Sequence, residues 1–464
     1  MVLTVKRMLY WLSVLQQKEY RTDRLLLFLK SKEGTRAFFS LLPLPKEFSR
    51  TGLKRPKITL RIFVITAMSV SLLIIWSIVF TRQESLITIS ALVIFYIFTP
   101  IIVASIAAIS SIPANLITAT LLFLASSKLR QTHPLVIGIT GSYGKTSTKL
   151  LLNHVLSTTL NVHCTPKSFN TPLSMSRDIL QNYHNEKILV LEFAAYRKGE
   201  IQKLTSFFSP EIAVVTGFAP QHLGLFGSED QIKQAKAELV QAVPNTNPVF
   251  CNGDDDGAIE ICKLGKKEPT LYHADLLKDM QLDMNGHLSF VWNRTAVHTQ
   301  LVGLHYANNI ACVISVAEYL GMKPQDIILA LQRFNPPDSF MQIIRGKQGA
   351  QIIDDGRTSN PKGFIAALSL LKAIKKDHTI LITNGIVDLG RSSESIHLEL
   401  AKKAKEIVDT VIYTGSEGKE QFSQVFGDHC IWKEQDMARE LEKAKQTTSI
   451  LIEGFLPKKY EVYL

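Results

Sequence analysis

The stretch Thr140-Gly-Ser-Tyr-Gly-Lys-Thr-Ser147 limits most strongly how this 464-residue chain can fold. It follows a short apolar run and leads into a helical pattern at 149–156. A strand, a glycine-rich turn and a helix N-terminus direct backbone N–H groups at anionic oxygens. In such a loop Lys145 reaches the outer phosphates of a nucleotide, and Thr146 offers its hydroxyl to Mg²⁺. The sequence therefore predicts a nucleotide site, although Ile139 stands where the common nucleotide loop begins with glycine.

Strand and helix patterns alternate from this loop to the end of the chain. This alternation predicts an α/β fold, with mostly parallel sheets covered by helices. We expect a P-loop-type central parallel sheet domain at 134–336 and, after Pro336-Pro337, a C-terminal Rossmann-like α/β domain at 337–464. The predicted strands are 135–140, 187–192, 212–216, 248–252, 350–353, 379–383, 410–413 and 449–452, and the predicted helices are 146–157, 228–242, 361–373 and 393–407.

Residues 1–133 are expected to form a basic amphipathic segment followed by an α-helical transmembrane hairpin. The runs 62–80 and 86–109 contain no charged residue. At about 1.5 Å per residue, each is long enough to cross a hydrocarbon layer of about 30 Å. Residues 1–61 hold 14 Lys/Arg against four acidic residues. The positive-inside rule then places this segment and the catalytic body on the cytoplasmic side of the cell (inner) membrane.

Two parts of this N-terminal region have open interpretations. The amphipathic segment either lies on anionic lipid or packs as an ordinary helix on the folded body. The uncharged run 112–126, with Pro113 near its start, is expected to be an interfacial helix, and a third membrane span is the alternative.

Charge and cysteine usage exclude several classes of function. Residues 1–61 carry +10 of the formal net charge of +11, so the other 403 residues are almost neutral. A nucleic-acid-binding protein would carry a basic footprint on its folded domains, and we expect no nucleic-acid partner. The five cysteines include no C-x-x-C pair. Neither a zinc site nor a disulfide framework is predicted.

Three further side chains suit a metal–phosphate site. Glu192 ends a buried strand, and ligands gather at the carboxyl ends of strands in α/β sheets. A carboxylate there can hold Mg²⁺ together with the loop hydroxyl. His222 follows another strand, and Lys236 lies on the next helix with Lys233. Taken singly, these residues have ordinary interpretations as a surface carboxylate, a loop histidine and a solvated helix face.

Taken together, these residues resemble the Mur ligases, ATP-dependent amide-forming ligases of peptidoglycan precursor synthesis, and most of all the members that add D-alanyl-D-alanine. The resemblance covers about residues 135–400. Besides the loop, its motifs are Leu191-Glu192, Thr216 with His222, Gln234-Ala-Lys-Ala-Glu238, Ser168-Phe-Asn-Thr171, Gly199-Glu-Ile201, Asn252-Gly-Asp254, Gly303-Leu-His305 with Asn309, Ile353-Asp-Asp355 with Asn360-Pro361, and Asp388-Leu-Gly390 with His397.

The resemblance implies a set of site residues. Thr146 and Glu192 would hold one Mg²⁺ ion. His222 and Lys236, the latter carbamylated, would hold a second, and Lys145 completes the catalytic set. The implied ATP-binding residues are Thr140, Gly141, Ser142, Tyr143, Gly144, Lys145, Thr146, Ser147, His305, Asn309 and Asp355, and the implied substrate-binding residues are Asn170, Thr171 and Asn360.

The resemblance also implies a reaction. The carboxylate of a muramyl-peptide precursor attacks the γ-phosphate of ATP, which gives an acyl phosphate and ADP. An amine donor such as D-Ala-D-Ala then displaces phosphate. Two Mg²⁺ ions and the loop lysine would offset charge on the transferred phosphoryl group.

Several positions depart from the family pattern. Phe340 stands where the family has an arginine that contacts nucleotide, Gly217 replaces an asparagine, and Arg357 interrupts the Asp-Asp…Asn-Pro motif. Residues 1–134 do not resemble the domain that binds the UDP-sugar, so the precursor is either UDP-linked or lipid-linked, with membrane lipid as a further partner. The alternatives are a poly-γ-glutamate or folylpolyglutamate type of ligase, and an inactive membrane-tethered nucleotide-binding scaffold.

Overall fold

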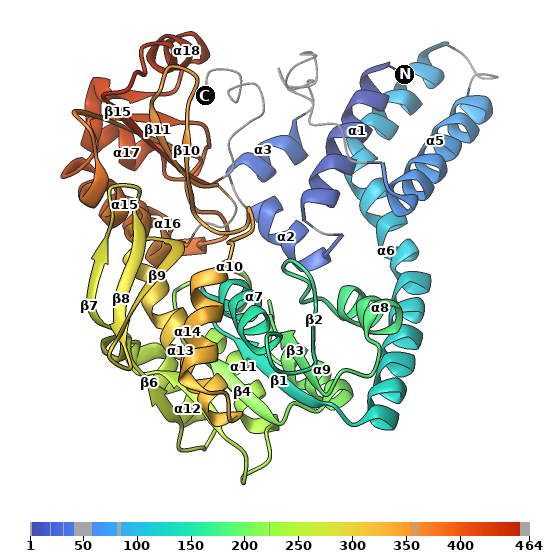
Figure 1. The fold of residues 1–464 in the computed structure, drawn as a ribbon. Helices are drawn as coiled ribbons and strands as arrows, with labels where there is room; N and C mark the ends of the chain where they lie inside the picture. Colours follow the sequence, from blue (N-terminus) through green and yellow to red (C-terminus); the bar gives the residue numbers. More distant parts are fainter. Residues whose placement is uncertain are drawn as a thin grey trace. The chain divides into compact units, whose positions relative to one another are not determined.

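The computed structural model describes residues 2–18, 20–30, 32–40, 58–80, 85–221, 223–356 and 360–454, which Figure 1 draws as coloured ribbon. The chain forms two compact units, Met1–Thr120 and Leu121–Leu464. Each unit is described by itself below. The three-part division at residues 133 and 336 stays a prediction.

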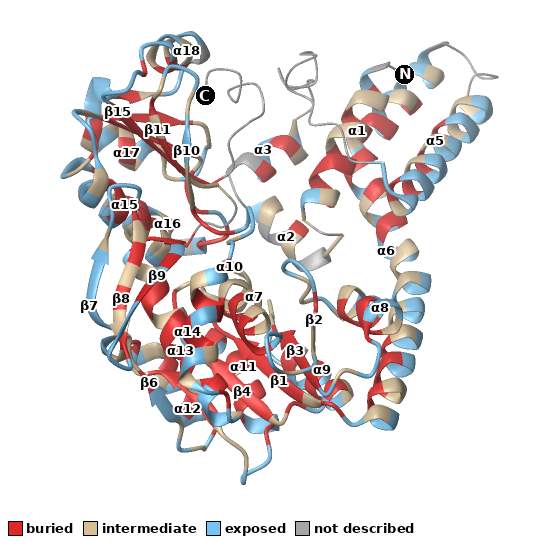
Figure 2. Cartoon of the chain, in the orientation of Figure 1, coloured by how far each residue is buried: buried red, intermediate tan, exposed pale blue. Residues whose placement is uncertain are grey.

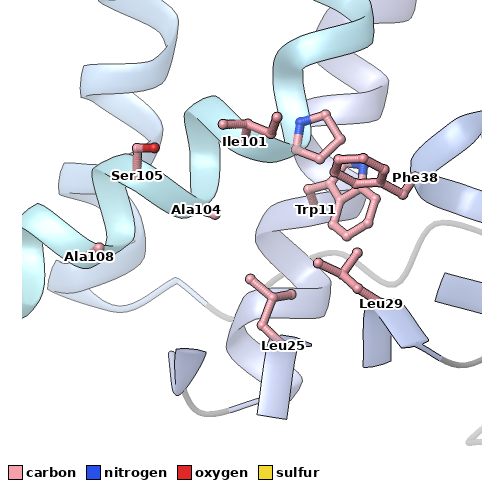
Figure 3. Close-up of a pocket in the computed structure, with 9 residues that line it drawn as sticks. Trp11, Leu25, Leu29, Phe38, Ile101, Ala104, Ser105 and Ala108 are labelled. Atoms are coloured by element: carbon pink, nitrogen blue, oxygen red, sulfur yellow. The ribbon is translucent and has the colours of Figure 1, made fainter. Parts of the chain in front are cut away.

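The first unit is α-helical. Its helices are α1 (Val2–Gln17), α2 (Thr22–Lys30), α3 (Lys32–Phe39), α5 (Leu60–Phe80) and α6 (Ser85–Thr132), the last of which continues into the second unit. Trp11 and Leu12 of α1 are buried in one apolar cluster with Ile65 of α5 and Phe95 of α6. Figure 3 shows Trp11 beside an apolar pocket of this unit. The indole N–H of Trp76 donates to the carbonyl of Ala91 at 2.9 Å, which joins α5 to α6. One face of α1 therefore packs against the helical pair.

Helices α5 and α6 are both long and apolar enough to cross a membrane. Residues 112–126 are helical as part of α6, which continues through Pro100 and Pro113 to Thr132. Their position at the membrane interface stays a prediction. A proline removes one intrahelical hydrogen bond, and a helix in an apolar environment tolerates this loss when neighbouring groups satisfy the freed carbonyl. In the last turns of α6, Leu122, Ala125 and Leu129 are buried against the α/β body.

The second unit begins with a six-stranded parallel sheet in the order β2-β3-β1-β4-β5-β6. Its strands are β1 (Leu135–Thr140), β2 (Val162–Cys164), β3 (Ile188–Glu192), β4 (Ile212–Val215), β5 (Val249–Asn252) and β6 (Thr270–Tyr272). The four predicted strands of this block are confirmed within one residue at each end. They are short apolar runs buried on both faces, which is typical of parallel strands between helices. Figure 2 shows this buried layer in red.

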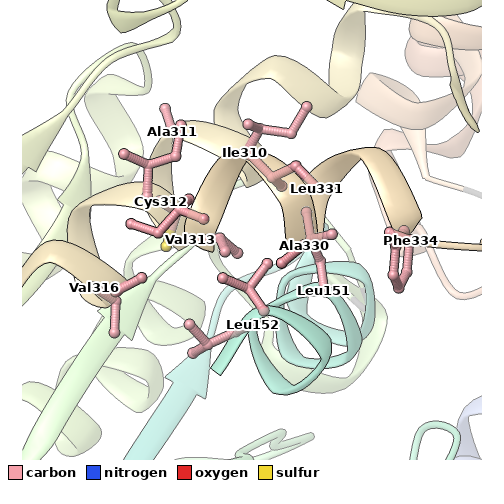
Figure 4. Packing of buried hydrophobic residues seen from close by; sticks show 14 of the residues in the cluster. Leu151, Leu152, Ile310, Ala311, Cys312, Val313, Val316, Ala330, Leu331 and Phe334 are labelled. Carbon is pink, nitrogen blue, oxygen red and sulfur yellow. The ribbon is translucent and has the colours of Figure 1, made fainter. Parts of the chain in front are cut away.

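Helices cover both faces of this sheet. The helices of the block are α7 (Lys145–Leu156), α8 (Pro172–Asn182), α9 (Glu200–Phe208), α10 (Leu223–Phe226), α11 (Glu229–Ala242), α12 (Asp256–Leu264), α13 (Ala307–Tyr319) and α14 (Pro324–Arg333). Helices α7, α13 and α14 share one core cluster, and α8, α9, α11 and α12 share the other. Figure 4 shows Leu151 and Leu152 of α7 packed against residues of α13 and α14.

A small antiparallel sheet, which the sequence patterns did not predict, follows β6. It consists of β7 (Lys278–Leu282), β8 (His287–Trp292) and β9 (Thr295–Val302). Asn293 and Arg294 connect β8 to β9, and both have positive φ angles, of 47° and 61°. Two central residues with positive φ form the tight turn that suits the twist of a hairpin.

The rest of the second unit contains a second α/β block. Its sheet has the order β10-β11-β15-β12-β13-β14, in which only the pair β10–β11 is antiparallel. The elements are β10 (Gln342–Arg345), β11 (Gln351–Asp355), α15 (Pro361–Ile374), β12 (His378–Thr383), α16 (Ser393–Lys405), β13 (Thr410–Tyr413), α17 (Lys419–Phe426), β14 (Cys430–Ile431), α18 (Glu434–Glu442) and β15 (Thr448–Glu453). The predicted α/β fold class is confirmed.

The core under α7 generates a stability prediction. Leu152 has no exposed surface, so Leu152→Ala leaves a cavity that close-packed neighbours fill only in part. We expect the free energy of unfolding to fall by about 2–5 kcal/mol, measured by urea titration of detergent-solubilised protein. Leu329→Ala on α14 is the control, because Leu329 is 47% exposed. Equal losses in the two variants would contradict the assignment of Leu152 to the core.

Candidate active site

The glycine-rich loop lies between β1 and α7, as the sequence predicts. Gly144 precedes α7 with a φ of 74°, and Gly141 has a φ of 152°. A Cβ at Gly141 would lie 2.1 Å from Thr216 Oγ1, so only glycine fits there. The hydroxyl of Thr216 lies within hydrogen-bonding distance of two backbone carbonyls, that of Thr140 at 3.1 Å and that of Tyr143 at 2.5 Å. The end of β4 therefore fixes the loop around the first turn of α7.

An unsatisfied group in this loop points to an anionic ligand. The hydroxyl of Ser142 is buried and has no hydrogen-bond partner among the described residues. A buried hydroxyl without a partner is costly, and a bound phosphate oxygen would satisfy it. The free N–H groups at the start of α7 lie directly after this residue. The loop therefore fits the phosphates of a nucleotide.

Two lysine ammonium groups meet at one loop carbonyl. Lys145 Nζ and Lys236 Nζ each donate to the Gly141 carbonyl at 2.8 Å. Burial lowers the pKa of Lys145, and burial together with the positive charge of Lys145 lowers the pKa of Lys236 well below its usual range. Lys233, on the same helix, instead pairs with Glu260 on the surface. The interpretation of Lys236 as part of a solvated face is therefore wrong.

Glu192 ends β3 inside the site. Only 1% of its surface is exposed, and its two oxygens accept hydrogen bonds from Thr146 Oγ1 at 2.8 Å and Asn170 Nδ2 at 2.9 Å. The interpretation of Glu192 as a surface carboxylate is therefore wrong. A hydroxyl and a carboxylate beside a phosphate loop fit Mg²⁺, which takes few protein ligands besides phosphate oxygens and water. The described residues contain no cluster of three or more His, Cys, Asp or Glu that could hold a metal without such oxygens.

Lys149, a site residue that was not predicted from the sequence, lies behind this carboxylate. Lys149 is fully buried, and its Nζ is 3.7 Å from Glu192 Oε2. It also donates to the carbonyl of Lys167 at 2.6 Å. Its spacing of four residues from Lys145 was the available signal, since residues i and i+4 share one face of a helix. Lys149 therefore balances the charge of Glu192 from inside the protein.

A second missed group connects the loop to α15. Tyr143 donates its hydroxyl to Asp255 Oδ2 at 2.6 Å, and Lys362 forms an ion pair with the same oxygen. Burial alone would raise the pKa of Asp255, but the hydrogen bonds from Lys362 and Tyr143 outweigh it and lower that pKa. Asp255 also caps α12. One buried carboxylate thus binds the phosphate loop, α12 and α15.

Of the implied ATP-binding residues His305 and Asn309, Asn309 lies at the loop. Asn309 Nδ2 donates to Thr148 Oγ1 at 2.7 Å and to the Gly144 carbonyl at 3.2 Å. His305 lies four residues earlier, with its ring 4.1 Å from that of Tyr306. Burial lowers the pKa of His305 to about 4, so this imidazole is neutral at pH 7.

Phe340 has a packing role. It is 3% exposed and stacks on Tyr306 with ring centroids 5.4 Å apart, and the tilted ring of Phe334 is also 5.4 Å away. The departure at this position therefore puts an aromatic ring into the core. Arg357 and His222 lie outside the described residues, so their predicted importance stays a prediction.

The remaining predicted residues lie at element ends. Asn170 holds Glu192, whereas the side chain of Thr171 caps α8 and that of Asn360 caps α15. Asp355 ends β11 in register with Glu453 at the end of β15. Burial and the neighbouring Asp354 raise the pKa of Asp355 to about 6.

This raised pKa predicts how stability depends on pH. The folded state favours protonated Asp355, so the carboxyl contributes stability below about pH 4, its unfolded pKa, and loses it as the pH rises through 6. Asp355→Asn should therefore be more stable than the wild type at pH 8, by about 1–3 kcal/mol, and nearly equal at pH 4. Urea titration at both pH values measures this difference.

The exposed Asp275 provides the control. Asp275→Asn should change stability equally at both pH values. A constant difference between Asp355→Asn and the wild type from pH 4 to 8 would contradict the raised pKa.

The comparisons with known proteins identify the family. The Mur ligase middle domain matches residues 139–317, and the Mur ligase, glutamate ligase domain matches residues 341–455. The chain belongs to the Mur ligase family, and it carries the middle and C-terminal domains of these enzymes.

Among its relatives are UDP-N-acetylmuramoyl-tripeptide–D-alanyl-D-alanine ligases. That of Bacillus subtilis is 28% identical over 300 residues, which are 64% of this chain and 66% of the relative. That of Mycobacterium bovis is 34% identical over 246 residues, which are 51% of this chain and 48% of the relative. The chain thus spans about half to two thirds of the length of these relatives.

Solved structures share the fold. MurF from Acinetobacter baumannii has a TM-score of 0.65 and 22% identity, over 75% of this chain and 79% of that chain. MurF ligase from Thermotoga maritima in complex with ADP has a TM-score of 0.64 and 24% identity, over 73% of this chain and 80% of that chain.

Proposed function

We propose that this chain is an ATP-dependent ligase that forms an amide bond between a muramyl-tripeptide carboxylate and D-Ala-D-Ala. The observation that carries the proposal is the contact between Thr146 of the phosphate loop and the buried Glu192. A phosphate-binding loop beside a carboxylate that can hold Mg²⁺ is the arrangement that enzymes use for phosphoryl transfer. The two substrates in the proposal are taken from the names of the relatives.

The reaction has two steps. The tripeptide carboxylate attacks the γ-phosphorus of ATP, the bond to the β-phosphate oxygen breaks, and an acyl phosphate and ADP form. The amine of D-Ala-D-Ala then attacks the acyl carbon, loses a proton, and expels inorganic phosphate. Lys145 and the loop N–H groups offset the charge on the transferred phosphoryl group.

Thr146 and Glu192 are the residues that would hold Mg²⁺, with Asn170 and Lys149 fixing the carboxylate. Bound there, the ion would act as a Lewis acid on the phosphate oxygens.

We assign a second Mg²⁺ to His222 and a carbamylated Lys236. The neutral Lys236 amine adds to the carbon of CO₂ and loses one proton, which converts the amine into a carboxylate-like ligand. Its buried position at the Gly141 carbonyl suits this role.

The proposed location is the inner face of the cell membrane. Helices α5 and α6 would form the spans, and the basic residues before α5 would stay on the cytoplasmic side with ATP.

An inactive nucleotide-binding scaffold is the competing function. It would have no use for a buried carboxylate fixed beside the loop hydroxyl. The absence of the family arginine at Phe340 is one departure that favours the scaffold, and the ring of Phe340 has a packing role on Tyr306 instead.

Release of phosphate from ATP tests the proposal. Wild-type protein with ATP, Mg²⁺, D-Ala-D-Ala and a muramyl tripeptide should release phosphate, and Lys145→Ala should reduce the rate about 10²–10³-fold, because the charge on the transferred group loses its partner. Lys233→Ala is the matched control, since that lysine pairs on the surface. Release that does not depend on Lys145 with any acceptor would favour the scaffold.

The modification of Lys236 has its own test. Lys236→Ala should abolish Mg²⁺-dependent phosphate release, and acetate in the buffer should restore part of it, because a small carboxylate replaces the carbamate. Lys236→Arg cannot form a carbamate and should stay inactive with or without acetate. Full turnover by Lys236→Arg would contradict a metal ligand at this position.

A further inference from the structure

A lysine of the protein already pairs with the carboxylate that would hold Mg²⁺. Lys149 Nζ lies 3.7 Å from Glu192 Oε2, and the two side chains are 0% and 2% exposed. The same oxygen accepts a hydrogen bond from the hydroxyl of Thr146 at 2.8 Å. A metal ion that binds Glu192 must therefore approach an oxygen whose charge an internal cation already balances.

Hydrogen bonds fix the ammonium of Lys149 in this position. It donates to the Lys167 carbonyl at 2.6 Å and to Thr165 Oγ1 at 3.4 Å, both in the connection from β2 to α8. Lys149 and Thr165 have no exposed surface. Because the ammonium is held inside the protein, it cannot move into water when a cation approaches the carboxylate.

Further positive charge surrounds Glu192. Lys145 precedes Lys149 by four residues, so both lie on one face of α7. Lys145 also interacts electrostatically with Glu192. The N–H groups at the start of α7 add the positive end of the helix dipole. Positive charges near a site oppose the entry of a cation and attract an anion. Without nucleotide, this part of the site therefore suits polyphosphate better than a divalent cation alone.

We propose that Lys149 is a positioning residue that keeps Glu192 from binding Mg²⁺ until a nucleotide supplies phosphate oxygens. The inference rests on the proposed function, which assigns Mg²⁺ to Thr146 and Glu192. The negative charge of bound phosphates offsets the two lysines, and the phosphate oxygens add the ligands that Mg²⁺ takes beside a protein carboxylate. The metal thus enters the site together with the nucleotide.

A role of Lys149 in packing alone makes a different prediction. If Lys149 only supported the fold, replacing it would weaken metal binding or leave it unchanged. If Lys149 neutralises Glu192, a neutral side chain of similar length creates metal binding in the absence of nucleotide. A gain of binding is therefore the result that separates the two roles.

Metal binding without nucleotide tests the proposal. Full-length protein in detergent is titrated with Mn²⁺, a substitute for Mg²⁺ whose sharp electron paramagnetic resonance signal is lost on binding. Lys149→Met should bind Mn²⁺ at least tenfold more tightly than the wild type, because Glu192 then lacks its internal counter-charge. Adding Glu192→Gln to this variant should remove the gain, which separates the ion from one at a carbamylated Lys236.

Two further variants control the experiment. Lys149→Gln is a second neutral variant, and its amide can still donate a hydrogen bond to the connection from β2 to α8. It should show the same gain as Lys149→Met. Lys403→Met is the matched control, because Lys403 pairs with Glu399 on the exposed surface of α16. This variant should bind Mn²⁺ as the wild type does.

Two results would overturn the proposal. One is the absence of a gain in both neutral variants of Lys149, with melting temperatures that show them folded. The other is Mn²⁺ binding to the wild type that is equally tight with and without ADP and is lost in Glu192→Gln. If neither neutral variant folds, this comparison of the wild type with and without ADP decides alone.

The binding experiment needs no acceptor, so it can fail separately from the proposed function. If the wild type turns over no acceptor but Lys149→Met gains Mn²⁺ binding that depends on Glu192, the ligase function fails and the role of Lys149 stands. If the wild type forms the amide bond and neither neutral variant gains Mn²⁺ binding, the ligase function stands and the role of Lys149 fails.

Discussion

The hydrogen bond between Thr146 and Glu192 is the contact on which the rest of the site depends. It joins the first turn of α7 to the end of β3, and the two residues lie 46 positions apart in the chain. Burying a carboxylate costs several kcal/mol unless partners compensate. Asn170 and Lys149 provide that compensation. The charge is therefore held ready at the position where a phosphate-bound cation needs it.

Much of this arrangement could be predicted from the sequence because buried parallel strands are short apolar runs, and the loop lies directly between one such run and a helix. The antiparallel sheet was not predicted, although β8 and β9 alternate between buried and more exposed residues as strands do. Only β7, with its mostly exposed Lys-Asp-Met-Gln-Leu sequence, lacks a strand pattern. The ion pair of Asp255 with Lys362 spans 107 residues. No local pattern announces such a contact, since only the folded chain brings the two residues together.

Phe340 shows where comparison with a family pattern is not enough. A missing arginine indicates a lost nucleotide contact only if the new side chain occupies the same space. Here the ring lies in the core in contact with Tyr306 and Phe334, so the substitution changes packing at this position. Lys236 shows the opposite case. Its pattern alone suggested a solvated face, and the fold directs its ammonium to the loop.

The three-way contact of Tyr143, Asp255 and Lys362 makes two events thermodynamically dependent on each other. The phosphate loop contributes the tyrosine, and α15 of the second α/β block contributes the lysine. Coupling free energies between two sites are reciprocal. If nucleotide binding changes the equilibrium constant of the ion pair between Lys362 and Asp255 by some factor, formation of that pair changes the affinity for nucleotide by the same factor. The buried carboxylate of Asp255 would therefore couple nucleotide binding at the loop to the contact that α15 makes with it.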